Sequence, residues 1–255
     1  MSSRTIRVAL FIVTFLPLLA AAQEGPPVFT STIISEWNVP RDKWAEFQTY
    51  AEKGLRPAAD RLVGDGTLTS YGIYETIIHE ENGYSHGLWL SAPTIAGVEK
   101  GRLELLKTPP PPSLSTARHR DRLMRSSLFK QRKASGTNGY MWVSSQMVQP
   151  GKTSDWRAVW EKYTKPTYVD LVDNGTIVSY ALQQEQAFTM DPAMRWVAYL
   201  AADAVSLDNA LLGFLAAGQK RTPQDREALA KGFADASVGG SNRVYLARVL
   251  WYSTR

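Results

Sequence analysis

The spacing of apolar residues between positions 42 and 63 predicts one long amphipathic helix. Apolar side chains recur there at helical intervals, at Trp44, Phe47, Ala51, Leu55, Ala58 and Leu62. Gly64-Asp65-Gly66 then ends the pattern, because glycine reaches the left-handed backbone conformation that closes a helix. The residues that follow, 67–78, are rich in β-branched and aromatic types, which favours a strand.

The same pattern occurs a second time in the chain. Residues 62–71 read LVGDGTLTSY, and residues 171–180 read LVDNGTIVSY. The same offset, without a gap, also matches Val39 with Val148, Lys43 with Lys152, and Pro57 with Pro166. An internal sequence repeat indicates a repeated structural unit, so the two halves are expected to fold alike.

Each half is predicted to be strand–helix–strand–strand–helix–strand. The strands are expected at 28–39, 67–79, 85–91 and 120–132, and again at 140–149, 176–187, 193–201 and 243–252. The main helices are expected at 42–63, 94–107, 152–173 and 203–217, with an extra helix at 222–237 opened by a Thr222–Asp225 capping box. Pro57 and Pro166 are expected to kink or split their helices.

This element order predicts an α+β fold made of tandem ferredoxin-like repeats, βαββαβ twice. The first repeat is expected at residues 28–133 and the second at residues 140–255. Each repeat would have one four-stranded sheet with helices on one face, and the two bare faces would be buried against each other.

The first 22 residues are typical of a secretory signal peptide. Arg4 and Arg7 precede an apolar run at 8–19 and then Ala20-Ala21-Ala22, so cleavage is expected after Ala22. A membrane anchor is the alternative, but a spanning helix needs about 20 apolar residues. The chain has no cysteine. We therefore expect a secreted protein, in a bacterial periplasm, with no membrane span after cleavage.

Basic residues gather in one stretch, 100–133, within a chain whose formal net charge is +5. Such a run usually forms a solvated face, and an anionic ligand or a membrane surface is the alternative. A secreted protein rarely meets nucleic acid, so no nucleic-acid partner is expected.

The three histidines all lie in the first half. An Asn82-Gly83 turn would place His79 opposite His86, with Glu80 or Glu81 nearby. Two ligands without a third are weak support for a metal, so no metal site is predicted.

His119 and Asp121 form the candidate catalytic pair. They are two residues apart on a predicted strand and therefore share a face. The predicted topology brings them toward Trp37, Tyr71 and Trp89, which would form the aromatic, ligand-binding wall of a cleft. A histidine in that place would serve as a general base, and the alternative is a structural His–Asp pair.

With its element order and the paired Asp65-Gly66-Thr67 and Asn174-Gly175-Thr176 signals, the chain resembles the dimeric α/β-barrel superfamily. The resemblance implies two units fused into one intramolecular barrel, with small ligands between sheet and helices. Members of that superfamily include cofactor-free oxygenases, haem-binding enzymes and degradative isomerases.

Three functions follow as hypotheses. The first is a periplasmic binding or accessory protein for a small apolar or aromatic ligand. The second is a cofactor-independent oxygenase or isomerase with His119 as its base. The third is a structural or partner-binding module without a ligand. The sequence assigns no cofactor and no oligomeric state.

Overall fold

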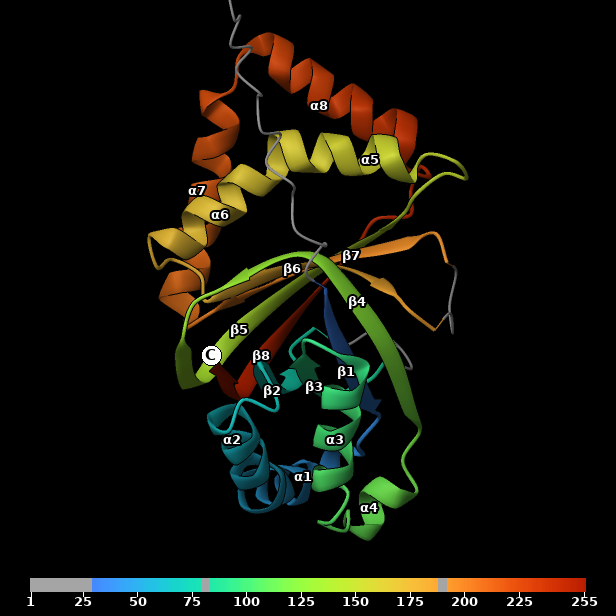
Figure 1. Ribbon diagram of the computed structural model, residues 1–255, viewed down its shortest axis with the longest axis vertical. Helices are drawn as coiled ribbons and strands as arrows, with labels where there is room; N and C mark the ends of the chain where they lie inside the picture. The colour runs from blue at the N-terminus through green and yellow to red at the C-terminus, as the bar shows by residue number, and fades with distance from the viewer. Residues whose placement is uncertain (1–28, 79–82, 188–191) are drawn as a thin grey trace, which may run out of the picture.

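The chain forms an eight-stranded barrel with helices around it, in a computed structural model that describes residues 29–78, 83–187 and 192–255 (Figure 1). The strands are β1 (Thr30–Trp37), β2 (Ser70–Thr76), β3 (His86–Ala92), β4 (His119–Gln131), β5 (Ala134–Met147), β6 (Ser179–Glu185), β7 (Met194–Ala201) and β8 (Arg243–Thr254). The helices are α1 (Trp44–Tyr50), α2 (Arg56–Gly64), α3 (Ile95–Leu105), α4 (Pro112–Ser115), α5 (Thr153–Val159), α6 (Lys165–Asp173), α7 (Ala204–Lys220) and α8 (Pro223–Ala236). Three further helical segments are η1 (Arg41–Lys43), η2 (Ala51–Leu55) and η3 (Trp160–Thr164). The predicted signal peptide, 1–22, lies outside the described residues.

All eight strands belong to one closed antiparallel barrel, and this corrects the predicted fold class. The strand order around the barrel is β1-β3-β2-β8-β5-β7-β6-β4. The prediction of tandem ferredoxin-like repeats, each with its own sheet stacked on the other, is wrong because hydrogen bonds cross between the halves twice. β2 pairs with β8, and β4 pairs with β6.

The physical reason for closure is the cost of an open edge. An edge strand leaves a row of backbone N–H and C=O groups without partners, and a closed barrel removes such edges. Residues 134–139, which separate the two predicted halves, are part of β5 and pair with β8.

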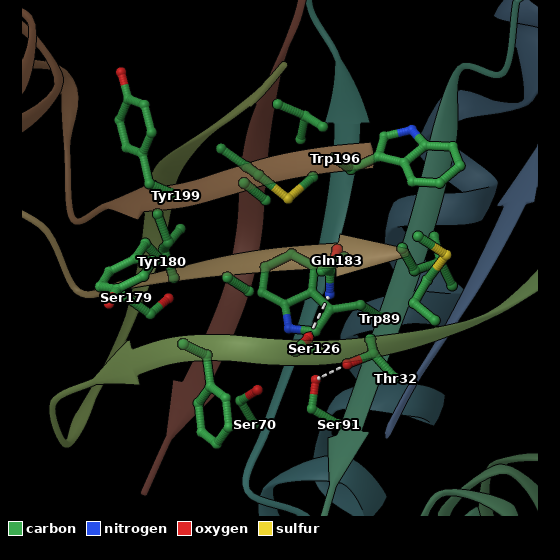
Figure 2. Close-up of a pocket in the computed structure, with 18 of the residues that line it drawn as sticks. Thr32, Ser70, Trp89, Ser91, Ser126, Ser179, Tyr180, Gln183, Trp196 and Tyr199 are labelled. Carbon is green, nitrogen blue, oxygen red and sulfur yellow. Dashed lines mark hydrogen bonds between the residues drawn. The ribbon is translucent and has the colours of Figure 1, made fainter. Parts of the chain in front are cut away.

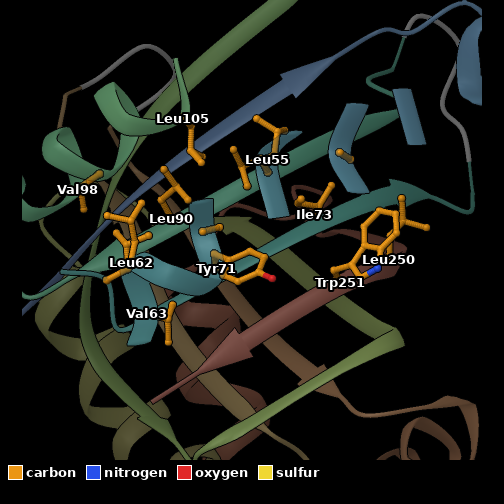
Figure 3. Packing of buried hydrophobic residues seen from close by; sticks show 14 of the residues in the cluster. Leu55, Leu62, Val63, Tyr71, Ile73, Leu90, Val98, Leu105, Leu250 and Trp251 are labelled. Atoms are coloured by element: carbon orange, nitrogen blue, oxygen red, sulfur yellow. The ribbon is translucent and has the colours of Figure 1, made fainter. Parts of the chain in front are cut away.

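The helices lie outside the barrel on two opposite sides (Figure 1). Those of the first half, α1 to α4, cover one side, and α5 to α8 cover the other. Each group packs an apolar core against the outer face of the strands, and Figure 3 shows the first of these, with Leu62, Tyr71 and Leu90 among its members. A third cluster fills part of the barrel interior and includes Met124, Met141 and Trp196.

The repeated glycine motif performs the same task in both halves, as predicted. Gly66 and Gly175 each have φ of +81°, just after α2 and α6. In the first half, the backbone N–H of Thr67 donates to Asp65 Oδ1 at 2.8 Å. In the second half, the backbone N–H of Thr176 donates to Asn174 Oδ1 at 3.0 Å. Each motif therefore ends a helix and directs the chain into a barrel strand.

The two prolines interrupt their helices in the same way. A π-helical turn, η2, stands directly before the segment that carries Pro57, and η3 stands before the segment that carries Pro166. Proline has no N–H to donate and its ring crowds the preceding turn, so the hydrogen-bond ladder widens there.

Candidate functional site

The barrel interior contains a partly open cavity of about 90 Å³. A single water needs about 10–15 Å³ on this measure, so the space corresponds to roughly six waters, or to one substituted aromatic ring. Its wall combines hydroxyl groups with aromatic rings, among them Thr32, Ser70, Ser91, Ser126, Ser179, Tyr74, Trp89, Phe129 and Trp196. A mixed wall of this kind suits a ligand that is largely apolar and carries a few polar atoms.

Two glycines make room for two of the aromatic rings in the wall, those of Trp89 and Tyr74. Gly72 lies opposite Trp89 across β2 and β3, and a β-carbon on Gly72 would stand 2.0 Å from the Trp89 ring. Gly87 lies opposite Tyr74 in the same way, with the Tyr74 hydroxyl 2.4 Å from the position of a β-carbon. Each ring therefore lies across the strand that faces it.

Hydroxyl and amide groups of the wall satisfy one another across neighbouring strands (Figure 2). Thr32 Oγ1 and Ser91 Oγ are 2.8 Å apart between β1 and β3. Gln183 Nε2 donates to Ser126 Oγ at 3.2 Å between β6 and β4. These pairs compensate each other, as buried polar groups usually do.

A buried ionic cluster stands beside the cavity, centred on Glu36. Its Oε2 accepts from Arg120 Nη2 at 2.7 Å and from Arg122 Nη2 at 2.9 Å. Its Oε1 accepts from the Tyr74 hydroxyl at 3.2 Å. Burial, followed by the Glu36 charge, raises the pKa of Tyr74 well above its usual value, so this hydroxyl stays a donor.

Arg122 connects this cluster to the cavity. It lines the cavity, is 4% exposed, and its guanidinium carbon lies 5.7 Å from the centre of the Trp196 ring. Burial works to lower the pKa of Arg122, but Glu36 and other negative groups raise it overall, so the side chain stays a cation. Its Nε is buried and has no hydrogen-bond partner among the described residues.

The two halves of the barrel differ at the position of Arg122. Arg122 on β4 pairs with Ile34 on β1, and the corresponding position of the second half is Tyr245 on β8, which pairs with Val143 on β5. Burial, followed by the Glu36 charge, raises the pKa of Tyr245 to about 12. The cationic group of the cavity is therefore supplied by the first half alone.

His119 and Asp121 pair with each other but lie outside the cavity wall. His119 Nε2 is 3.1 Å from Asp121 Oδ1, and both side chains are more than one-third exposed. The His119 ring stacks on Trp37, with ring centres 5.0 Å apart. Along β4 these two residues alternate with Arg120 and Arg122, so they face the outside of the barrel.

Tyr71 and Trp89 do not meet, because they lie on opposite faces of the barrel wall. Tyr71 packs under the helices and donates to Asp60 Oδ1 at 2.6 Å. Trp89 belongs to the interior and lines the cavity. Of the five predicted site residues, the structure brings His119, Asp121 and Trp37 together on the outside and places Trp89 in the cavity.

Arg122 and Glu36 are the site residues that sequence reasoning missed. Arg122 sits in the basic stretch, which the sequence analysis interprets as a solvated face. Its alternation with Met124 and Ser126 along one strand was the available signal for an inward direction.

The described residues offer little for a metal or a haem at this cavity. No group of three or more metal-ligating side chains gathers within the described ranges. His79, Glu80 and Glu81 lie outside those ranges, and His86 is buried against Trp44 and Phe47. No histidine lines the cavity among the residues that the structure describes, and about 90 Å³ is too small for a haem, so haem does not fit this site.

Within the described residues, no helix is both long enough and apolar enough to cross a membrane.

Comparison with known proteins finds likeness in structure only. No family model matches the chain, and no curated protein matches it by sequence. Two solved structures are described as putative monooxygenases. The one from Lactobacillus acidophilus NCFM has a TM-score of 0.62 at 10% identity, covering 88% of this chain and 96% of its own. The one from Fusobacterium nucleatum subsp. nucleatum has a TM-score of 0.64 at 10% identity, covering 89% and 95%. An anthrone oxidase-like protein has a TM-score of 0.50 at 10% identity, covering 89% and 93%.

Proposed function

The chain has the fold of the dimeric α/β-barrel superfamily, and from this premise we propose that it is an oxygenase-type protein that oxidises a small aromatic substrate with dioxygen and without a cofactor. The observation that carries the proposal is the partly open interior cavity, sized for about one aromatic ring and lined by rings and hydroxyls. Two structural neighbours that match nearly over their whole length are described as putative monooxygenases, which supports the same class.

The charges of the wall indicate which substrates suit such a reaction. Arg122 is the one charged residue among the described lining residues, and no carboxylate or imidazole accompanies it there. A substrate that loses its proton in water and enters as an enolate or phenolate needs no base in the cavity. The proposal therefore concerns acidic aromatic ketones and phenols, and it does not use His119.

The reaction balances without a reductant when the substrate has a methylene group next to a carbonyl. One oxygen atom of dioxygen replaces the two methylene hydrogens, so that the methylene carbon becomes a new carbonyl carbon. The other oxygen atom leaves with those two hydrogens as one molecule of water. The substrate supplies all the electrons that reduce dioxygen.

1,3-Indanedione is a suitable probe, because its methylene is flanked by two carbonyls and is largely ionised near neutral pH. We expect protein-dependent oxygen uptake and formation of indane-1,2,3-trione, detected as its hydrate because the central carbonyl adds water. Heat-denatured protein serves as the control. If the protein binds the probe but oxygen uptake only equals that of the control, the protein is a binding protein that does not turn the probe over.

That binding protein is the second candidate function, and one observation favours it. The described lining residues include no acid–base side chain other than the tyrosines and Arg122, whose pKa values are raised or high. Secretion to a periplasm would suit this candidate as an accessory protein. Binding of the probe under nitrogen, without oxygen uptake in air, would select it.

A further inference from the structure

Two buried donors on lining residues lack a partner within the described residues, Arg122 Nε and the Tyr199 hydroxyl, and only Arg122 Nε belongs to a charged group. Arg122 Nε is fully buried and has no partner within the described residues, while Nη2 of the same side chain is held by Glu36 at 2.9 Å. We propose that this Nε–H binds an oxygen atom of the ligand, so that the ligand class is an aryl ketone or phenol, held most tightly as its anion. The inference rests on the proposed function, because it assumes that the cavity holds the substrate.

The cost of an unsatisfied donor supports this assignment. A buried charged donor without an acceptor is destabilising by more than a neutral one, and native proteins rarely leave one in place. Glu36 fixes the plane of the guanidinium group from one side, so Nε cannot rotate to another protein acceptor without breaking that ion pair. The missing acceptor is therefore expected from the occupant of the cavity.

Aromatic rings stand next to this donor. The Arg122 guanidinium carbon is 5.7 Å from the Trp196 ring centre, and Trp196 and Trp89 both line the cavity (Figure 2). A ligand whose oxygen meets Nε would thus place its ring among apolar groups. The hydroxyl pairs Thr32–Ser91 and Gln183–Ser126 already satisfy each other, which leaves Arg122 as the stronger donor.

The charges around Arg122 favour an oxygen acceptor over a second cation. Glu36 and Glu185 are buried near it and Arg120 shares Glu36, so two carboxylates balance two guanidinium groups. The cluster is neutral as a whole, and a neutral ketone can enter. An enolate or phenolate gains more, because hydrogen bonds between charged partners are about twice as strong as neutral ones.

A matched pair of neutral probes isolates this hydrogen bond. Acetophenone and α-methylstyrene have nearly the same shape, but only acetophenone carries an oxygen in place of the terminal methylene. We expect the wild-type protein to bind acetophenone at least about tenfold more tightly in calorimetric titration, as a hydrogen bond to a charged donor implies. This comparison needs no variant and is independent of oxygen uptake.

Two variants then assign the preference to Arg122. Arg122→Met should bind both probes equally, within about twofold, and its retained affinity for α-methylstyrene shows that the cavity is intact. Arg120→Met is the control, because Arg120 pairs with the same Glu36 oxygen but does not line the cavity. We expect Arg120→Met to keep the preference for acetophenone.

The outcomes separate the inference from the proposed function. Equal binding of the two probes by the wild-type protein would mean that Nε bonds only to water, and would overturn the inference while the cavity remains a binding site. If the protein binds neither probe, the cavity does not hold a single-ring ligand. That result would overturn the proposed function and the inference with it. A preference that survives Arg122→Met would assign the donor to another residue and overturn the inference.

Discussion

Trp89 holds its place in the cavity wall because the residue opposite it has no side chain. A β-carbon on Gly72 would stand 2.0 Å from the Trp89 ring, far inside van der Waals contact. The indole is rigid, so it can relieve this contact only by turning into the cavity that it lines. Overpacking of this kind in a closed interior usually lowers the free energy of unfolding by about 1–3 kcal/mol.

We therefore expect Gly72→Ala to destabilise the protein by that amount and to weaken binding in the cavity. Urea unfolding gives the stability, and tryptophan fluorescence reports the displaced ring. Gly64→Ala is the control, since no atom lies within 4 Å of a β-carbon there, and it should not lower stability, because alanine favours the helix by up to about 1 kcal/mol over glycine. Unchanged stability in Gly72→Ala would show that Trp89 moves freely.

His119 gives a second prediction at this scale, and it tests the sequence-based hypothesis of a general base. The ring stacks on Trp37 and pairs with Asp121 on the outer face of β4. We expect His119→Ala to lower the melting temperature slightly and to leave oxygen uptake with 1,3-indanedione within about twofold, since an exposed pair contributes only about 0–1 kcal/mol. Loss of uptake with unchanged probe binding would instead assign the base to His119.

The extra helix of the second half, α8, begins at a capping box that the sequence predicts. Thr222 Oγ1 accepts the backbone N–H of Asp225 at 3.1 Å and donates to Asp225 Oδ2 at 2.8 Å. Pro223 occupies the first turn, where its missing N–H costs nothing. The helix then packs on α5, with the Trp156 and Phe233 ring centres 5.9 Å apart.

Thr222→Ala should cost about 1 kcal/mol of stability, because it leaves the first-turn N–H without its acceptor. Amide hydrogen exchange should quicken in the first turn of α8 before other helices respond. Thr49→Ala is the comparison, since Thr49 bonds only to Ala45 O within an exposed helix and should change little. Equal effects of the two changes would argue against the cap.

Helices and turns were predicted correctly where they depend on residues that are close in sequence. The helix at 42–63, its closing glycine and the proline interruption all depend on neighbours in sequence, and each is present. β5 begins at Ala134, six residues before the predicted start, because Gly136 and Gly139 give no strand pattern. Those residues are ordered by pairing with β8, more than a hundred positions away.

The dependence on long-range strand pairing also explains why the sequence did not predict the site. Glu36 and Arg122 both look like surface residues in sequence, and only the pairing of β1 with β4 brings them together inside the barrel. The predicted cleft joined Trp89 with Tyr71, but Trp89 lines the interior cavity and Tyr71, on the neighbouring strand, faces the helices. Period-two alternation shows that two faces exist but does not say which one lies inside.

For the whole molecule, the buried tyrosines predict how stability depends on pH. Burial, followed by the Asp173 charge, raises the pKa of Tyr180 to about 12, and Tyr245 reaches about 12 through burial and Glu36. Unfolded tyrosine titrates near pH 10, so the folded chain retains protons that the unfolded chain releases at about pH 10–12. The free energy of unfolding should be fully retained below about pH 10 and should fall as pH rises toward 12.

Urea unfolding at about pH 8 and about pH 11 measures this fall. Tyr245→Phe removes one of the titrating groups, so its stability should decline less steeply over the same interval. A stability that stays level up to pH 12 would mean that these hydroxyls titrate as they do in the unfolded chain.

The unequal pair Arg122 and Tyr245 has a consequence for stoichiometry. A barrel assembled from two identical chains must repeat every inward side chain around its twofold axis, so a cation on one wall implies the same cation on the other. Joining both halves in one polypeptide lifts that restriction, and here the two positions hold a guanidinium and a phenol. If the cavity binds its ligand through Arg122, we expect one ligand per barrel in one orientation, so a titration should saturate at a single equivalent per chain.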